Sequence, residues 1–216
     1  MINQIQRLSQ RYPMLKKCEP DIVGAFEILT EVFVADKRLY ICGNGGSAAD
    51  ALHITGELVK SFSLERTLDG KFAAGLERES FGGLAEMLQG ALPVFALVEN
   101  AAFATAYAND CDVDYIFAQQ VYAYAREGDC VLAISTSGNS RNVVLAVETA
   151  RLRGAKTVAL TGKGGGKLKE LCDVSICVPE TETYKVQELH IPVYHALCLM
   201  LEEYFWGEDG IWKRSY

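Results

Sequence analysis

Apolar residues recur at helical spacing along the first part of the chain. Ile5, Leu8, Tyr12 and Leu15 follow one another three or four positions apart, and a second such run extends from Ile22 to Val34. Positions three and four apart lie on one face of a helix. The pattern therefore predicts two antiparallel helices, an N-terminal helical hairpin within residues 1–36, with the break near Pro20.

Short, continuously apolar runs replace this spacing from residue 38 onward. They occupy residues 38–42, 93–98, 130–134, 157–160 and 174–178, and helical patterns follow several of them. Strands covered on both faces, as in parallel sheets, are apolar throughout. We therefore expect a single α/β domain over residues 1–216, a three-layer αβα sandwich around a five-stranded parallel sheet.

Residues 62–90 do not fit this alternation. Glycines, charges of both signs and scattered apolar residues follow one another there. An irregular segment of this length in a compact domain is usually functional or mobile. We expect an insertion with a short helix near residues 84–88, lying beside an active-site mouth or a subunit interface, although a decorative surface loop is the alternative. Its apolar residues should then pack against a neighbour: Phe72, Leu76, Phe81, Leu84 and Leu88.

Composition and charge exclude several classes of protein. Half of the 216 residues are hydrophobic and 23% are charged, which is typical of a globular chain. The net charge of −7 disfavours nucleic acid as a partner. No apolar segment has the length of a membrane span, and the first residues do not have the pattern of a signal peptide. Seven cysteines without a C-x-x-C pair indicate reduced thiols and hence a cytoplasmic protein.

Two glycine-containing turns each follow an apolar run and precede a helical pattern. The first comprises residues 43–47, and the second, residues 135–140, contains four hydroxyl side chains. Backbone amides at a helix start bind anions, and ligands bind at the carboxyl ends of parallel strands. Neither turn reads G-x-x-x-x-G-K-[ST] or G-x-G-x-x-G, so we expect a phosphate monoester and no nucleotide cofactor. The alternative is that both turns are only helix N-caps.

The chain has three histidines, His53, His190 and His195. His53 and Glu57 are four residues apart and share one face of a predicted helix. His190 and His195 are separated by about 140° of helical rotation, so we expect one of them to be structural. Pro192, between them, should either open or kink the last helix.

These motifs together resemble the SIS (sugar isomerase) domain. The sequence Gly43 to Asp50 with His53 and Glu57, residues 135–140, and Gln187 to His190 with His195 occur in that order. The chain is more closely similar to the sedoheptulose-7-phosphate isomerase, or phosphoheptose isomerase, family, over nearly its whole length outside residues 62–90. The resemblance implies the flavodoxin-like SIS fold and conversion of sedoheptulose 7-phosphate to D-glycero-D-manno-heptose 7-phosphate, an aldose–ketose isomerisation through an enediol(ate). It also implies a homotetramer with active sites between subunits.

The resemblance assigns roles to individual residues. It makes Glu57 the catalytic base and His195 the acid, and so leaves His190 structural. It implies a Zn²⁺ ion held by His53, Glu57, Gln187 and His195. Because Gln187 and His195 are about 12 Å apart along an unbroken helix, they can share a metal only if the helix starts late or the site joins subunits. The implied substrate contacts are Asn44, Gly45, Gly46, Ser47, Glu57, Asn109, Asp110, Ser135, Thr136, Ser137, Ser140 and Gln187.

Three features depart from the family pattern. The segment between Glu57 and Asn109 is longer, Ser61 stands beside Lys60 where an arginine is frequent, and Tyr184 replaces an aspartate. They leave open an isomerase for another sugar phosphate. A noncatalytic SIS scaffold protein that binds a replication initiator is a further alternative, and the presence of both catalytic residues favours the enzyme over it.

Overall fold

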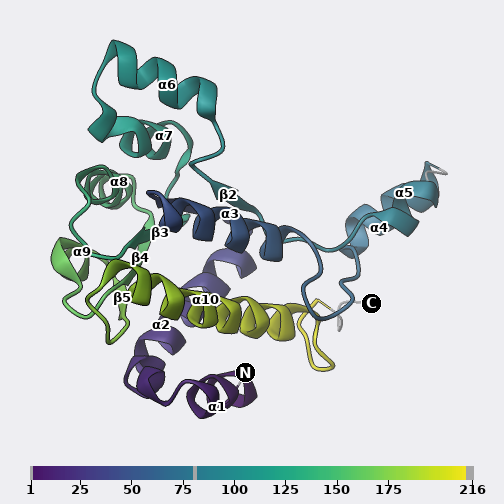
Figure 1. Cartoon of the computed structure of the whole chain (residues 1–216). Helices are drawn as coiled ribbons and strands as arrows, with labels where there is room; N and C mark the ends of the chain where they lie inside the picture. The colour runs from purple at the N-terminus through teal and green to yellow at the C-terminus, as the bar shows by residue number, and fades with distance from the viewer. Residues whose placement is uncertain (1, 80–81, 213–216) are drawn as a thin grey trace.

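The computed structural model describes residues 2–79 and 82–212, and its helices surround one sheet (Figure 1). The strands are β1 (Leu39–Gly43), β2 (Val94–Ala96), β3 (Cys130–Ser135), β4 (Lys156–Thr161) and β5 (Val174–Cys177). The helices are α1 (Ile2–Arg11), α2 (Glu19–Val34), α3 (Gly46–Val59), α4 (Gly70–Arg78), α5 (Gly82–Met87), α6 (Ala101–Asp110), α7 (Ile116–Tyr124), α8 (Arg141–Leu152), α9 (Gly166–Leu171) and α10 (Thr183–Trp206), with 3₁₀ turns η1 (Pro13–Cys18) and η2 (Val113–Tyr115).

The five strands form a parallel sheet in the order β2-β1-β3-β4-β5. Alternate residues of a strand point to opposite faces, and β1 divides in this way between two apolar cores. Leu39 and Ile41 belong to the core that contains residues of α1, α2, α3 and α10, whereas Tyr40 and Cys42 belong to the core that contains residues of α7, α8 and α9. The predicted three-layer sandwich and its parallel sheet are confirmed.

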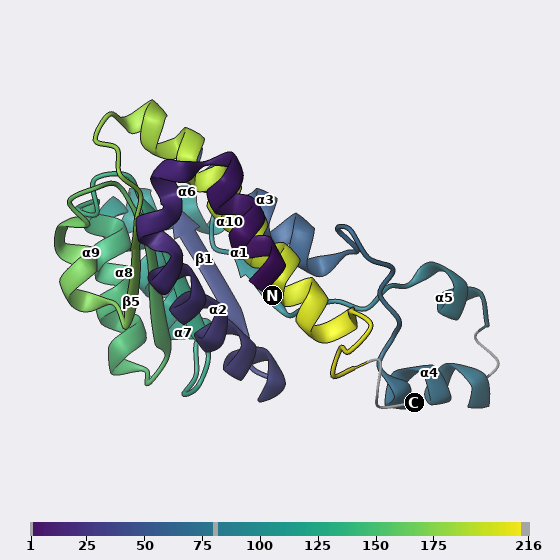
Figure 2. The same ribbon diagram turned by 90° about the horizontal axis from the view of Figure 1, so that it is seen from below.

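The N-terminal segment differs in detail from the prediction. The break falls at η1, ahead of Pro20, and α2 begins at Glu19. Proline fits the first turn of a helix because the amide at that position has no partner within the helix. The first helix packs along α10 (Figure 2).

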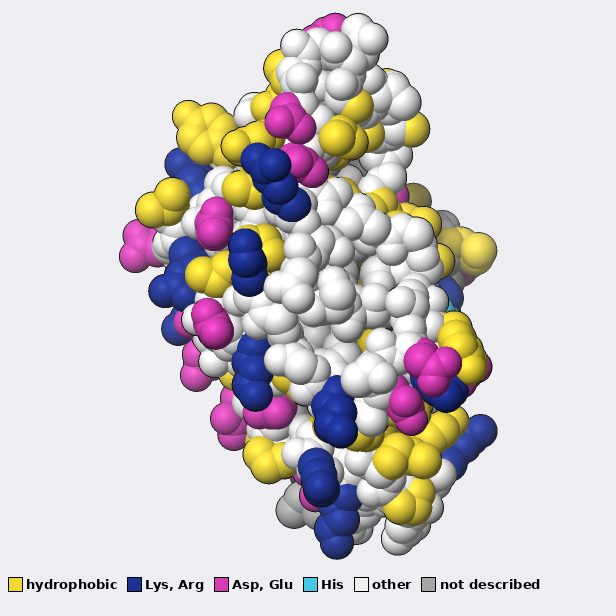
Figure 3. Space-filling model, turned by 60° about the vertical axis from the view of Figure 1, so that its left-hand side comes forward, with side chains coloured by type: hydrophobic (Ala, Val, Ile, Leu, Met, Phe, Trp, Pro, Cys, Tyr) yellow, Lys and Arg dark blue, Asp and Glu magenta, His cyan; other side chains and the backbone are white. Residues whose placement is uncertain are grey.

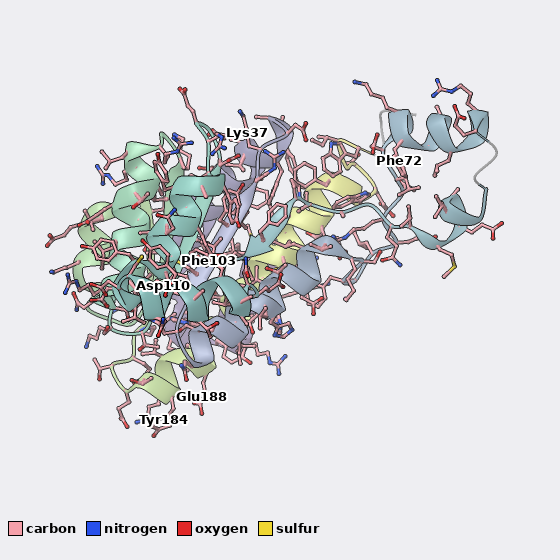
Figure 4. The ribbon with its side chains drawn as sticks, turned by 90° about the horizontal axis from the view of Figure 1, so that it is seen from above. Lys37, Phe72, Phe103, Asp110, Tyr184 and Glu188 are labelled. Atoms are coloured by element: carbon pink, nitrogen blue, oxygen red, sulfur yellow. The ribbon has the colours of Figure 1, made fainter. Side chains whose placement is uncertain are left out.

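Helices α4 and α5 form an arm, residues 69–89, that projects from the sandwich (Figures 1 and 2). The sequence predicted a helix only near α5. Leu76 is buried, but Phe72, Leu84 and Leu88 are between 44% and 48% exposed. Phe81 lies outside the described residues. The arm therefore carries apolar side chains away from the body of its own chain, as Phe72 illustrates in Figure 4.

Charged side chains lie at the surface, and four of the thiols lie in the interior. Basic and acidic side chains are interspersed on the face shown in Figure 3. All seven cysteines are free thiols, and Cys18, Cys42, Cys130 and Cys198 are buried. Within the described part of the chain, no helix combines the length and apolar character needed to cross a membrane. Cytoplasmic location stays a prediction.

Candidate active site

A cavity of about 340 Å³ lies where the two glycine-containing turns meet, at the carboxyl ends of β1 and β3. The first helical residues of α3 and α10, Gly46 and Thr183, and the N-cap of α8, Ser140, all line it. Amides at three helix starts therefore surround one space, with the positive ends of the helix dipoles. The other lining residues are Asn44, Gly45, Ser47, Ile134, Ser135, Thr136 and Gln187. This cavity can hold an anion.

Side-chain hydrogen bonds join the first turn to the start of α8 and close the second turn on itself. The carboxamides of Asn44 and Asn142 exchange hydrogen bonds of 2.8 and 2.9 Å. The hydroxyls of Ser135 and Ser140 are 2.9 Å apart and also bond to each other. These hydrogen bonds therefore fix the walls of the cavity.

Gly138 and Gly46 allow close approaches that other residues would prevent. Gly138 has a φ of +66°, and a Cβ there would lie 1.9 Å from the carbonyl oxygen of Gly165. A Cβ on Gly46 would lie 2.4 Å from Nε2 of Gln187. Glycine at position 46 thus lets the Gln187 carboxamide reach the start of α3.

A second polar cluster, the Glu57 cluster of His53, Glu57, Lys60 and His195, lies further along α3 and α10. Nε2 of His53 is 3.2 Å from Oε1 of Glu57, and the Lys60 ammonium is 3.2 Å from its Oε2. The Glu57 side chain is 14% exposed. A partly buried carboxylate is thus held between an imidazole and a cation.

His195 completes this cluster from α10. Its ring centroid is 5.0 Å from that of His53 and 5.6 Å from that of Phe62. Nε2 of His195 is buried and has no hydrogen-bond partner among the described residues. Burial lowers the pKa of His195, the nearby His53 lowers it further, and Glu57 opposes both. His195 is therefore neutral at pH 7 and can offer an N–H to a substrate oxygen.

Sequence reasoning missed Tyr194 and Asp50, which lie behind His53. The Tyr194 hydroxyl is 2.9 Å from Nδ1 of His53, and the Tyr194 ring contacts both histidines, His53 and His195. Burial raises the pKa of Asp50 to about 6, although the Tyr194 hydroxyl and His53 favour its charged form. A lone tyrosine inside an apolar helical pattern gave no signal of this contact.

A buried ion pair between Arg66 and Glu202 supports the end of α3. Nε of Arg66 lies 2.7 Å from Oε1 of Glu202, and their side chains are 0% and 1% exposed. The guanidinium also donates to the backbone carbonyls of Glu57 and Leu58. The Glu202 carboxylate accepts from the amides of residues 62–64. The segment between α3 and the arm, which contains residues 62–66, is thereby joined to the helix that carries Glu57.

The remaining predicted residues lie elsewhere. His190 is fully buried in the core, and burial lowers its pKa to about 4, so it is neutral and suited to a structural role. Asn109 and Asp110 lie exposed at the end of α6, bonded to each other at 2.9 Å, and neither lines the cavity (Figure 4). Ser137 also does not line it, and its Oγ accepts a hydrogen bond from the Asn139 amide.

The four implied zinc ligands do not meet within one chain. Gln187 lies beside Gly46 at the start of α3, while His53, Glu57 and His195 gather near its end. Helix α10 starts at Thr183 and includes both Gln187 and His195, so a late helix start is excluded. In the described residues, no three or more His, Cys, Asp or Glu side chains are placed to hold a metal ion.

Sequence profiles and relatives identify the family. Two SIS domain profiles match residues 105–201 and 2–79. A phosphoheptose isomerase from Rhodospirillum rubrum is 41% identical over 189 residues, which cover 88% of this chain and 88% of the relative.

Solved structures give the same result. A phosphoheptose isomerase from Neisseria gonorrhoeae is 33% identical with a TM-score of 0.73, covering 94% of this chain and 95% of that one. One from Francisella tularensis is 28% identical with the same TM-score, covering 94% and 98%. With its anion cavity, its Glu57 cluster and these relatives, the chain belongs to the phosphoheptose isomerase family of SIS domain proteins.

Proposed function

We propose that this protein converts sedoheptulose 7-phosphate to D-glycero-D-manno-heptose 7-phosphate through an enediol(ate). Membership of the family makes it a sugar-phosphate isomerase. The observation that carries the proposal is the placement of His53, which contacts both Glu57 and His195. An aldose–ketose isomerisation needs a group that takes a proton from carbon and a group that protonates or polarises oxygen, and a carboxylate and an imidazole are suited to these roles.

Each residue has a distinct part in the reaction. Glu57 takes the proton from the carbon beside the carbonyl, and His195 donates a hydrogen bond or a proton to the oxygen. The phosphate lies in the cavity, held by helix-start amides and the hydroxyls of Ser135, Thr136 and Ser140. Lys60 keeps a positive charge next to Glu57.

The metal stays a prediction. His53, Glu57 and His195 are of residue types that bind Zn²⁺ and lie near one another, but in the described part of the chain they are not placed to hold one ion together. A bound Zn²⁺ ion would stabilise negative charge on a substrate oxygen. Gln187 could join the set only across an interface between copies.

The same geometry supports a homotetramer with active sites between subunits. Residues 46 and 57 are about 16 Å apart along the axis of α3, and Glu57 does not line the anion cavity. A substrate held in the cavity therefore needs catalytic groups from elsewhere, and a second copy supplies them. Light scattering of the purified protein tests this directly.

Tyr184 favours an alternative substrate, another sugar phosphate, as the second candidate. Tyr184, which stands in place of an aspartate, is 57% exposed at the start of α10 and points away from the sheet (Figure 4). The position borders Thr183 in the cavity wall, so it can influence the substrate.

Turnover of sedoheptulose 7-phosphate beside a panel of pentose and hexose phosphates tests the function. We expect the heptose phosphate to have the highest kcat/KM, and Glu57→Gln to abolish most of that turnover. Preference for a pentose or hexose phosphate would support the other sugar-phosphate isomerase. Absence of turnover with every sugar, together with tight phosphate binding, would instead support the scaffold protein.

A further inference from the structure

The carboxamides of Asn44 and Asn142 form a closed pair at the wall of the anion cavity. Nδ2 of Asn44 lies 2.8 Å from Oδ1 of Asn142, and Nδ2 of Asn142 lies 2.9 Å from Oδ1 of Asn44. Asn44 belongs to the first turn and lines the cavity, whereas Asn142, the second residue of α8, does not line it. Asn142 is therefore placed to act on a bound ligand through Asn44.

A closed pair of this kind decides which groups of Asn44 remain for a ligand. A carboxamide has one carbonyl oxygen and two N–H groups, and its terminal torsion is broad and roughly two-fold. A free asparagine can therefore turn either its oxygen or its nitrogen towards a ligand. In the pair, each side chain uses its oxygen and the N–H on the same side of the C–N bond. The second N–H of Asn44 is left over and is held in one direction.

An N–H in a fixed direction has the right polarity for this cavity. The helix starts and the hydroxyls of Ser135 and Ser140 suit a ligand with negatively charged oxygens. An N–H attracts such an oxygen, whereas a carbonyl oxygen turned the same way would repel it. Donors that are held in place before binding need no reorganisation when the ligand arrives.

We propose that Asn142 is a positioning residue that holds the Asn44 carboxamide as a hydrogen-bond donor to an oxygen of the ligand in the anion cavity. Ser140, the N-cap of α8, lies two residues earlier and also lines the cavity. The pair therefore keeps the Asn44 donor in a fixed place relative to the second turn. That the ligand is a sugar phosphate rests on the proposed function, whereas the orientation of Asn44 does not.

Asn142→Ala removes the pair and leaves Asn44 in the cavity wall. Loss of a typical hydrogen bond lowers affinity about 3–10-fold. We expect that loss for sedoheptulose 7-phosphate by calorimetry, and a KM raised by the same factor with kcat within about twofold of wild type. Glu148→Ala, an exposed change on the same helix, is the control and should leave affinity and KM unchanged. Wild-type affinity in Asn142→Ala would overturn the proposal, even with a lowered melting temperature.

Further variants test whether Asn142 acts through Asn44. In the Asn44→Ala protein, Asn142→Ala should cause no further loss of affinity, because residues that act through one path are non-additive; additive losses would overturn the proposal. Asn142→Leu removes both hydrogen bonds at similar size, and it replaces Asn142→Ala if that variant does not fold. Asn142→Asp keeps an acceptor for Nδ2 of Asn44. It should bind more tightly than Asn142→Leu at about 1 M salt, where its charge is screened, and equal affinities would contradict the role of Asn142.

NMR of protein labelled with ¹⁵N only at asparagine tests the orientation without turnover. The chain has six asparagines, and Asn44→Ala and Asn142→Ala assign the signals of the pair. Saturating sedoheptulose 7-phosphate or inorganic phosphate should shift the Asn44 carboxamide signals in wild type, and less in Asn142→Ala. Binding without a shift at Asn44, or no binding of either probe, would overturn the proposal. If phosphate causes the shift but no sugar phosphate is turned over, the proposed function fails and the orientation of Asn44 stands.

Discussion

Replacing Arg66 by leucine should remove much of the protein's stability. The change leaves the Glu202 carboxylate buried without its cation and the carbonyls of Glu57 and Leu58 without a donor. Removing one partner of a buried ion pair costs about 3–5 kcal/mol. For a chain of this size, each 1 kcal/mol lowers the melting temperature by about 2–4 °C, which gives a decrease of roughly 6–20 °C.

The Arg66→Leu/Glu202→Leu double variant distinguishes a simple ion pair from a wider network. A simple pair replaced on both sides by apolar groups is often neutral. Here the amides of residues 62–64 would lose their acceptor, and the α3 carbonyls their donor. We therefore expect the double variant to remain destabilised. Arg66→Lys should recover only part, since one ammonium cannot bridge three acceptors as the guanidinium does.

Thermal and urea unfolding followed by circular dichroism measure these changes. Arg78→Leu is the control, because Arg78 pairs with Glu79 at the surface, where ion pairs contribute little. A melting temperature for Arg66→Leu within 2 °C of the control, or a double variant as stable as wild type, would refute the reasoning.

The cavity, the base, the arm and the buried histidine give further tests. Ser140→Ala should weaken sugar-phosphate binding about 10–100-fold and Ser137→Ala much less; equal losses by calorimetry would contradict the cavity. Glu57→Gln should lower kcat by about 10²–10⁴ without changing melting temperature; normal turnover would contradict its role as the base. Replacing residues 70–87 by a short Gly/Ser linker retains the Arg66 contacts, and light scattering and a sugar panel should then show a changed assembly or substrate preference; if neither changes, the arm is decoration. As the pH falls, His190 is protonated in the unfolded chain before it is protonated in the folded protein, where burial lowers its pKa to about 4. Between pH 6.5 and 4, the free energy of unfolding of the wild type should therefore decrease by up to about 1.4 kcal/mol per pH unit more than that of His190→Leu; equal slopes in urea titrations would contradict this.

The sheet could be predicted because each strand has its own pattern in a short stretch of sequence. Parallel strands covered on both faces are continuous apolar runs, and the glycines that follow β1 and β3 mark where each chain segment turns into a helix. The N-terminal break was misplaced because proline is equally compatible with a chain break and with the first turn of α2. Helix α4 was missed because its glycines, Gly70 and Gly75, resemble loop residues.

The site was less predictable, because its supporting contacts join distant parts of the chain. Arg66 and Glu202 belong to no local sequence pattern, and only the fold brings the segment after α3 and helix α10 together so that they pair. Tyr194 reads as one more apolar position of a helix, and only the fold places its hydroxyl at His53. The glycine and hydroxyl turns were visible because a close approach to an anion needs those residue types consecutively.

Helices α3 and α10 explain why the two halves of the site lie apart in one chain. Gln187 and His195 lie on α10 about 12 Å apart along its axis, and Gly46 and Glu57 are spread over a comparable length of α3. Gln187 touches the start of α3, whereas His195 meets His53 nearer its end. No bending within either helix brings the anion cavity to the Glu57 cluster without breaking backbone hydrogen bonds. We therefore propose that a complete isomerase site forms where the cavity of one copy faces the Glu57 cluster of another. The segment that joins α3 to the arm lies close to that cluster, because the Arg66 guanidinium donates to the backbone carbonyl of Glu57.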